Sequence, residues 1–150
     1  MSPADLMGAL ESANALRRLA AADPAARGAA DLAETMLDRL LGVSRRLAVY
    51  GSLAPGRENH SVIEGIPGEW LEGFVRGRHH PSGWGATMGY PAMRWDPAGE
   101  RIPVSVLVSE ALPSHWARLD RFEGNEYERI LVPVEDDSGR IAAANIYALR

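Results

Sequence analysis

The chain has 150 residues and contains no cysteine, no lysine and no glutamine. Without cysteine, disulfide bonds, thiol catalysis and thiolate metal sites are excluded. Without lysine, any mechanism that forms a Schiff base on a lysine side chain is excluded as well. All 16 basic residues are arginine. In a chain this rich in alanine and glycine, that bias is most simply explained by genomic composition rather than by chemistry.

Long apolar runs are also absent, since none approaches the roughly 18 residues that a membrane-spanning helix needs. The first residues, Ser2 to Asp5, lack the basic start and apolar stretch of a signal peptide, so a cytoplasmic protein with no membrane partner is the default expectation. The net charge of -4 gives no reason to expect a nucleic-acid partner. Apolar residues make up 46% of the chain, as in ordinary globular proteins.

The first 45 residues differ from the rest, because they are rich in alanine and leucine and poor in β-branched residues. Ser2 followed by Pro3, and Asp23 followed by Pro24, are two helix starts, and Gly42 is a stop signal. The pattern predicts a helical hairpin as a first unit, residues 1–45. Its apolar stripes require burial. Two alternatives stay open: the hairpin packs on the rest of the chain, or it forms a homodimer.

Residues 46–150 form the second predicted unit, in which short β-type runs are separated by glycine and proline. About six strands are predicted, at Leu47–Tyr50, Gly68–Arg78, Ala86–Trp95, Arg101–Ser109, Tyr127–Glu135 and Gly139–Leu149. Leu112–Phe122 is the one internal helix, and residues 136–139 form a hairpin turn. The predicted fold class is α+β: a small mixed or antiparallel β-barrel with one internal helix, preceded by the helical hairpin.

Glu123 lies at the end of the predicted internal helix. It follows Leu119 by four residues and Trp116 by seven, so it projects from the apolar face. Burial disfavours the charged form of a carboxylate and raises its pKa, as a general acid/base near neutrality requires. The alternative is a residue of the last helical turn that points to solvent, or that pairs with Arg121 or Arg129.

A second candidate feature is the strand that breaks at Gly51, within Tyr50-Gly51-Ser52-Leu53. Successive backbone N–H groups in such a turn form a small anion site, which suits a carboxylate or a developing oxyanion. The alternative is an ordinary turn between a strand and a loop. A nucleotide site is not expected there, because the Gly-Lys-Ser/Thr signature of a phosphate loop is absent.

These segments together resemble the γ-glutamylcyclotransferase-like family, which includes the AIG2-like proteins. The resemblance covers residues 46–150 in order, and each motif in it is short. The matching segments are Tyr50-Gly51-Ser52-Leu53 followed by Pro55-Gly56 and Asn59, then Gly89-Tyr90-Pro91-Ala92, then Leu119-Asp120-Arg121-Phe122-Glu123-Gly124 followed by Tyr127 and Arg129, and finally Ile146-Tyr147.

The resemblance implies a small mixed β-barrel and an enzyme, a lyase or acyltransferase, that cyclises a γ-glutamyl group to 5-oxoproline with release of an amine or amino acid. Glu123 corresponds to the family's acid/base. Gly51, Ser52 and Leu53 would bind the γ-glutamyl group through backbone amides, with Tyr50 and Tyr127 lining the site. No metal or cofactor is implied. The alternative function is a non-catalytic module, on the same fold, that binds a small ligand or another protein.

Two further features are open to interpretation. Residues 79–88 form a glycine-rich stretch, longer than the resemblance leads us to expect, that is either a lid or a surface loop; Trp84 within it is a candidate ligand contact. The four histidines, His60, His79, His80 and His115, lack zinc-site spacing, so no metal site is predicted. The identity of the released amine does not follow from the sequence.

Overall fold

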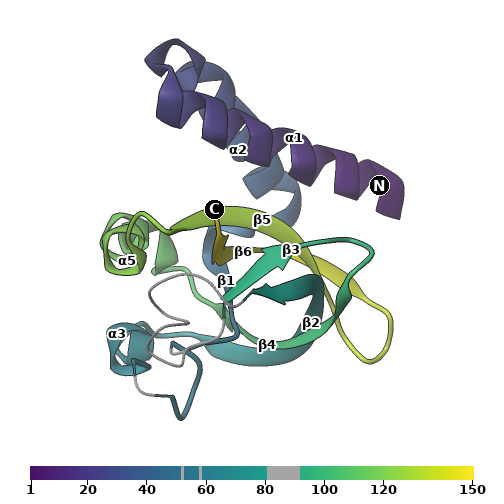
Figure 1. Ribbon diagram of the computed structural model, residues 1–150, viewed down its shortest axis with the longest axis vertical. Coiled ribbons are helices and arrows are strands. Elements are labelled where there is room, and N and C mark those ends of the chain that lie inside the picture. The colour runs from purple at the N-terminus through teal and green to yellow at the C-terminus, as the bar shows by residue number, and fades with distance from the viewer. Residues whose placement is uncertain (52, 58, 81–91) are drawn as a thin grey trace.

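The computed structural model describes residues 1–51, 53–57, 59–80 and 92–150. Six strands form one sheet in the order β3-β2-β4-β1-β6-β5, and an additional pairing between β2 and β5 closes five of them into a barrel. The strand β3 lies outside this closed ring, against the end of β2. Figure 1 shows the barrel below and a pair of N-terminal helices lying across its upper side. The predicted α+β class is confirmed.

The barrel is mixed, because β1 pairs antiparallel with β4 and parallel with β6. The other ladders are antiparallel. The strands are β1 (Arg46–Val49), β2 (Glu69–His80), β3 (Ala92–Trp95), β4 (Glu100–Val108), β5 (Tyr127–Glu135) and β6 (Ile141–Leu149). They agree with the predicted strands to within about two residues at most ends. The predicted start of the third strand, residues 86–91, lies outside the described residues.

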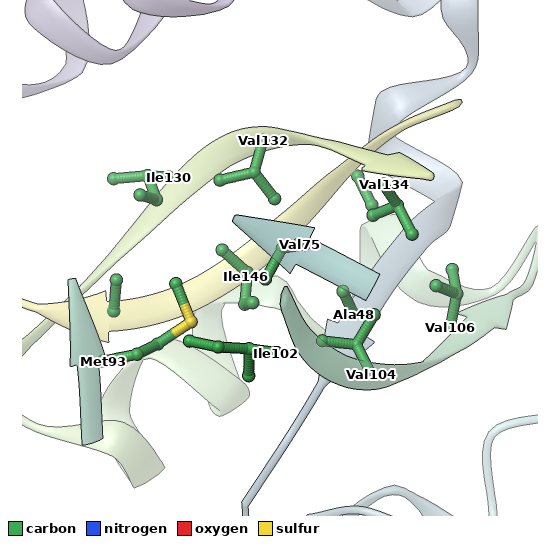
Figure 2. Close-up of a cluster of buried hydrophobic side chains, with 12 residues drawn as sticks. Ala48, Val75, Met93, Ile102, Val104, Val106, Ile130, Val132, Val134 and Ile146 are labelled. Carbon is green, nitrogen blue, oxygen red and sulfur yellow. The ribbon is translucent and has the colours of Figure 1, made fainter. Parts of the chain in front are cut away.

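The interior of the barrel is filled by side chains that alternate along the strands, as a half-buried strand requires. They form one cluster of buried side chains, shown in Figure 2: Ala48, Val75, Met93, Ile102, Val104, Val106, Ile130, Val132, Val134, Ala144, Ile146 and Ala148. The barrel closes at Gly73, where an added Cβ would lie 2.7 Å from the carbonyl oxygen of Glu135. Only glycine allows β2 and β5 to approach this closely.

The helices α1 (Pro3–Ala22) and α2 (Arg27–Leu41) form the predicted hairpin. Ser2 caps α1 in a reciprocal pair of hydrogen bonds with Asp5, and Asp23 caps the short 3-10 turn that leads into α2. Gly42 ends α2 in the left-handed conformation, with φ of 66°. The start and stop signals in the sequence therefore operate as expected.

The hairpin is attached to the barrel at the open edge of β5. The amide of Asn14, which is 2% exposed, donates to the carbonyl oxygen of Leu131 at 2.9 Å and accepts from its N–H at 2.7 Å. One side chain thereby replaces a missing neighbouring strand at that point. Around it, Leu10, Ala13 and Leu37 of the hairpin pack with Leu131 in one apolar cluster.

The described helices α3 (Ser61–Glu64) and α5 (Trp116–Glu123), which follow β1 and β4 in the sequence, also lie on the outside of the barrel (Figure 1). The helix α5 begins later than predicted, because Leu112–Ser114 forms a separate 3-10 turn. The short helix α3 was not predicted, so the expectation of a single internal helix was wrong. At four residues, α3 is too short to show a helical period in the sequence. Among the described residues, no helix is long and apolar enough to cross a bilayer.

Candidate active site

The helix α5 is anchored by its apolar face. Trp116 and Leu119 are buried in an apolar cluster on the outer side of β1 and β6, together with Leu47, Val49 and Tyr147. Gly124 ends the helix with φ of 79°, a conformation that favours glycine. Glu123 is therefore the last helical residue, and the apolar anchoring of α5 fixes where its carboxylate lies.

Glu123 is half-buried, as its spacing from Leu119 predicts. Burial raises the pKa of its carboxyl group to about 7. Of the two possible partners of Arg129, Asp120 and Glu123, the structure shows Asp120, with Arg129 Nε 2.9 Å from Asp120 Oδ1. Because no basic side chain among the described residues forms an ion pair with Glu123, burial alone sets this shift, and Glu123 can hold or release a proton near neutral pH.

Tyr50 is the first residue of the loop that follows β1, and it lies close to Glu123. Burial raises the pKa of the Tyr50 hydroxyl, and the charges of Glu123 and Tyr127 raise it further. The Tyr50 hydroxyl donates to the carbonyl oxygen of Tyr147 at 2.9 Å. The structure therefore brings Tyr50 together with Glu123 and Tyr127, which lie more than 70 residues later in the sequence.

Two hydrogen bonds join described residues that follow Tyr50. The N–H of Ala54 donates to the carbonyl oxygen of Gly51 at 3.0 Å, and His60 Nδ1 hydrogen-bonds the carbonyl oxygen of Leu53 at 2.9 Å. The Leu53 side chain is buried in the same cluster as Trp116 and Leu119. Ser52 lies outside the described residues, as do Trp84 and all of the predicted 79–88 loop beyond His80.

Tyr127 begins β5 and is buried. Its side chain packs with Ala92 and Leu149, at the end of the barrel where β3, β5 and β6 meet. Its effect on the pKa of Tyr50 places it near that phenol. The position next to Tyr50 agrees with the predicted role of Tyr127 in lining the site, and that role stays a prediction.

Tyr147 and Asp120 also lie at the site, although the sequence did not predict them as site residues. The hydroxyl of Tyr147 donates to Asp120 Oδ1 at 2.6 Å, and burial, Asp120 and the charge of Glu123 all raise the pKa of Tyr147. The same carboxylate of Asp120 accepts from Arg129. Both residues belong to the motifs quoted above, but only the fold shows that they meet, since nothing in their spacing indicates a contact between β6 and α5.

A cavity of about 630 Å³ adjoins this region on the side of the N-terminal hairpin. Its lining includes Gly124, Tyr127 and Tyr147 as well as Arg17 and Arg18 of α1. The hairpin therefore borders the neighbourhood of the candidate site. Within the part of the chain that the structure describes, no group of three His, Asp or Glu side chains is arranged to hold a metal.

Comparison with known proteins decides the family. The sequence model described as "Gamma-glutamyl cyclotransferase, AIG2-like" matches residues 47–150. The chain belongs to the AIG2-like γ-glutamyl cyclotransferase family. This match confirms the resemblance seen in the sequence and leaves the N-terminal hairpin outside the matched region. A comparison with curated proteins finds no match.

Solved structures agree with this fold. The crystal structure of YkqA from Bacillus subtilis is similar with a TM-score of 0.54 and 26% identity, over 71% of this chain and 36% of that one. The chain thus spans little more than a third of the YkqA chain. An AIG2-like protein from Mus musculus is similar with a TM-score of 0.52 and 20% identity, over 69% of this chain and 76% of that one. At 20% identity, the second similarity concerns the fold alone.

Proposed function

We propose that the protein is a γ-glutamylcyclotransferase, which converts a γ-glutamyl amine or peptide to 5-oxoproline and a free amine. The observation that carries the proposal is the environment of Glu123. A half-buried carboxyl group whose pKa is raised to about 7 lies beside Tyr50, at the start of the glycine turn. Membership in the AIG2-like family supports the same reaction class.

The proposed reaction needs little from the protein beyond orientation and one proton carrier. The α-amine nitrogen of the substrate attacks its own γ-carbonyl carbon, and a five-membered ring forms. The bond between that carbon and the leaving nitrogen then breaks. Because the attack is intramolecular, holding the chain in the folded conformation removes much of the barrier. The α-ammonium nitrogen loses two protons as it becomes the ring N–H, and the leaving nitrogen gains two as it departs as an ammonium ion. Glu123 carries these protons one after the other, so protons balance.

The glycine turn supplies the second part of the proposal. Backbone N–H groups of Gly51, Ser52 and Leu53 would hold the γ-glutamyl group, either at its α-carboxylate or at the oxyanion that develops on the γ-carbonyl. Tyr50 and Tyr127 would form the walls around this group. The reaction as written uses no cofactor and no metal ion.

The experiment is 5-oxoproline release from a panel of γ-glutamyl amines and γ-glutamyl dipeptides. Glu123→Gln removes the proton carrier and keeps the shape of the side chain. Glu126→Gln is a matched control, since it changes an exposed glutamate three residues away. Release by the wild type and by Glu126→Gln, but not by Glu123→Gln, would support the proposal and identify the leaving group.

Absence of 5-oxoproline across the panel, from a folded protein, would favour the alternative function. In that case the barrel would be a module that binds a small ligand or another protein without turnover. Turnover separates the two functions. An enzyme loses 5-oxoproline release in Glu123→Gln, whereas a binding module has no such activity to lose.

We further propose that the hairpin supports a homodimer. Leu32, Met36 and Leu40 of α2 are exposed and recur at every fourth residue, so they form one apolar stripe. We infer that this stripe packs against the same stripe of a second copy of the chain. An antiparallel pair of α2 helices about a two-fold axis at Met36 would set Leu32 of one copy against Leu40 of the other.

A further inference from the structure

The N-terminal hairpin reaches the candidate site through Arg17 of α1. Its Nη1 donates to the backbone carbonyl oxygen of Arg129 at 2.9 Å, and its Nη2 donates to Asn145 Oδ1 at 2.9 Å. The same Nη2 lies 2.6 Å from Glu34 Oε1, on α2. The Arg17 side chain is only 14% exposed, so these contacts hold a largely buried guanidinium in one position.

Arg129, which Arg17 contacts, is one of the residues that hold α5 against the barrel. Its Nε lies 2.9 Å from Asp120 Oδ1, and its guanidinium carbon lies 4.4 Å from the centre of the Trp116 ring. Trp116 and Asp120 are four residues apart, so Arg129 holds two successive turns of α5 on one side. Glu123 follows Asp120 by three residues, within the next turn of the same short helix.

Asn145 couples the two arginines. Its Oδ1 accepts from Arg17 Nη2 and from Arg129 Nη1, both at 2.9 Å, and its Nδ2 donates to the carbonyl oxygen of Val43 at 2.8 Å. Asn145 is fully buried. Two cations that share one oxygen repel each other, and Glu34 and Asp120 offset this repulsion from opposite sides. The position of each guanidinium therefore depends on the other.

We propose that Arg17 is a positioning residue for the reaction: it fixes Arg129, which holds α5 and so sets where Glu123 lies. The expected effect of Arg17 on the reaction rate rests on the proposed cyclotransferase function. The expected effect of Arg17 on the position of α5 does not. It assigns a working role to a part of the chain outside the family match, which begins at residue 47. The link runs from α1 through β5 and β6 to α5.

Loss of Arg17 should loosen this link and change the environment of Glu123. Tyr50 from the end of β1 and Tyr147 from β6 face Glu123, Asp120 lies on the same helix, and Arg129 of β5 reaches it through Asp120. None of these groups is itself removed by a change at Arg17. A looser α5 admits water to the Glu123 carboxyl, and its pKa should fall from about 7 toward its ordinary value.

Arg18 offers a matched control. It is the next residue on α1, and it also ties the hairpin to β5, with Nη2 2.7 Å from Glu128 Oε1. Its side chain is 57% exposed, and none of its hydrogen bonds to described residues goes to Arg129, Asn145 or Asp120. Arg18→Met therefore weakens the attachment of the hairpin without touching the link to α5.

The experiment compares the wild type with Arg17→Met and Arg18→Met in the full chain. The titration of Glu123 is followed by carboxyl ¹³C NMR, with the signal assigned by its loss in Glu123→Gln. In parallel, kcat and KM are measured against pH with the best substrate of the panel. For Arg17→Met we expect the Glu123 titration to move down by about one pH unit, with kcat about tenfold lower and KM within about twofold. Arg18→Met should match the wild type.

An unchanged Glu123 titration in folded Arg17→Met would overturn the proposal, and so would an equal shift in Arg18→Met. If Arg17→Met does not fold, Arg17→Lys replaces it. A lysine keeps the charge beside Glu34, but it cannot donate in a fork to both Arg129 and Asn145, so a smaller shift in the same direction is expected. If the wild type shows no turnover, the proposed function fails, while the NMR titration still decides the role of Arg17.

Discussion

Tyr147 and Asp120 are joined by a hydrogen bond of 2.6 Å between the tyrosine hydroxyl and Oδ1. This bond ties the last strand to the helix that carries Glu123. Its effect on the site is indirect but specific: Tyr147 also supplies the carbonyl oxygen that accepts from the Tyr50 hydroxyl. One residue of β6 thereby fixes both the helix of the candidate acid/base and the first residue of the glycine turn.

Replacement of Glu123 by glutamine should stabilise the protein at alkaline pH. The folded carboxyl has a pKa of about 7, while the unfolded value is 4.5. Between these values the unfolded state has lost its proton and the folded state still holds it, so the stability of the wild type falls as pH rises from about 4.5 to 7. Glutamine does not titrate. We expect Glu123→Gln to gain about 1–3 kcal/mol relative to the wild type between pH 4.5 and 8, reduced for partial solvent access.

Urea unfolding of the two proteins at pH 4.5 and pH 8 measures this difference. Glu126→Gln, at an exposed position, should show no such change between the two pH values. A gap between wild type and Glu123→Gln that is the same at both pH values would mean that the Glu123 carboxyl is not held in its neutral form by burial.

Substitution of Asn14 should lower the stability of the protein more than most other substitutions in the hairpin. Asn14→Leu keeps a similar size but leaves both backbone groups of Leu131 without the partners they now have at 2.9 and 2.7 Å. Unsatisfied buried groups of this kind cost about 1–3 kcal/mol each. We expect a loss of about 2–4 kcal/mol in the free energy of unfolding, measured in urea. Ser12→Ala, at an exposed position on the same helix, should stay within about 0.5 kcal/mol of the wild type.

The apolar stripe on α2 should determine the oligomeric state. Light scattering coupled to size exclusion should give a dimer for the wild type, whose single chain has a mass of 16.3 kDa. Exchanging Leu32, Met36 and Leu40 for arginine or glutamate should give a monomer that keeps its fold, because these side chains are exposed in one copy. A monomeric wild type across the micromolar range would contradict the homodimer.

Much of the fold follows from local sequence signals. Ser2, Asp23 and Gly42 mark the ends of the hairpin helices. The β-type run at residues 127–135, followed by the predicted turn at 136–139, gives the bounds of β5 as observed. These signals act within a few residues, so a single sequence carries them. The helix α3 was missed because four residues do not display a period.

The site was predictable only in part, because local signals do not show which distant residues meet. Helical spacing alone places Glu123 on the apolar face, and its half-buried position agrees. The partner of Arg129 could not be chosen between Asp120 and Glu123, since both lie on the same helix and the answer depends on how α5 docks. The contacts of Arg17 with Arg129 and Asn145 could not be predicted, because they join residues more than a hundred positions apart.

The most direct test of the account is the steady-state rate of 5-oxoproline release by the wild type and by Glu123→Gln, with the best γ-glutamyl substrate. If Glu123 carries the proton, kcat should fall at least about 100-fold in the variant while KM stays within a few-fold, and the wild-type kcat/KM should rise with pH through about 7. A variant that keeps its rate within about threefold of the wild type would contradict the account, because the reaction would then proceed without the carboxyl group on which it depends.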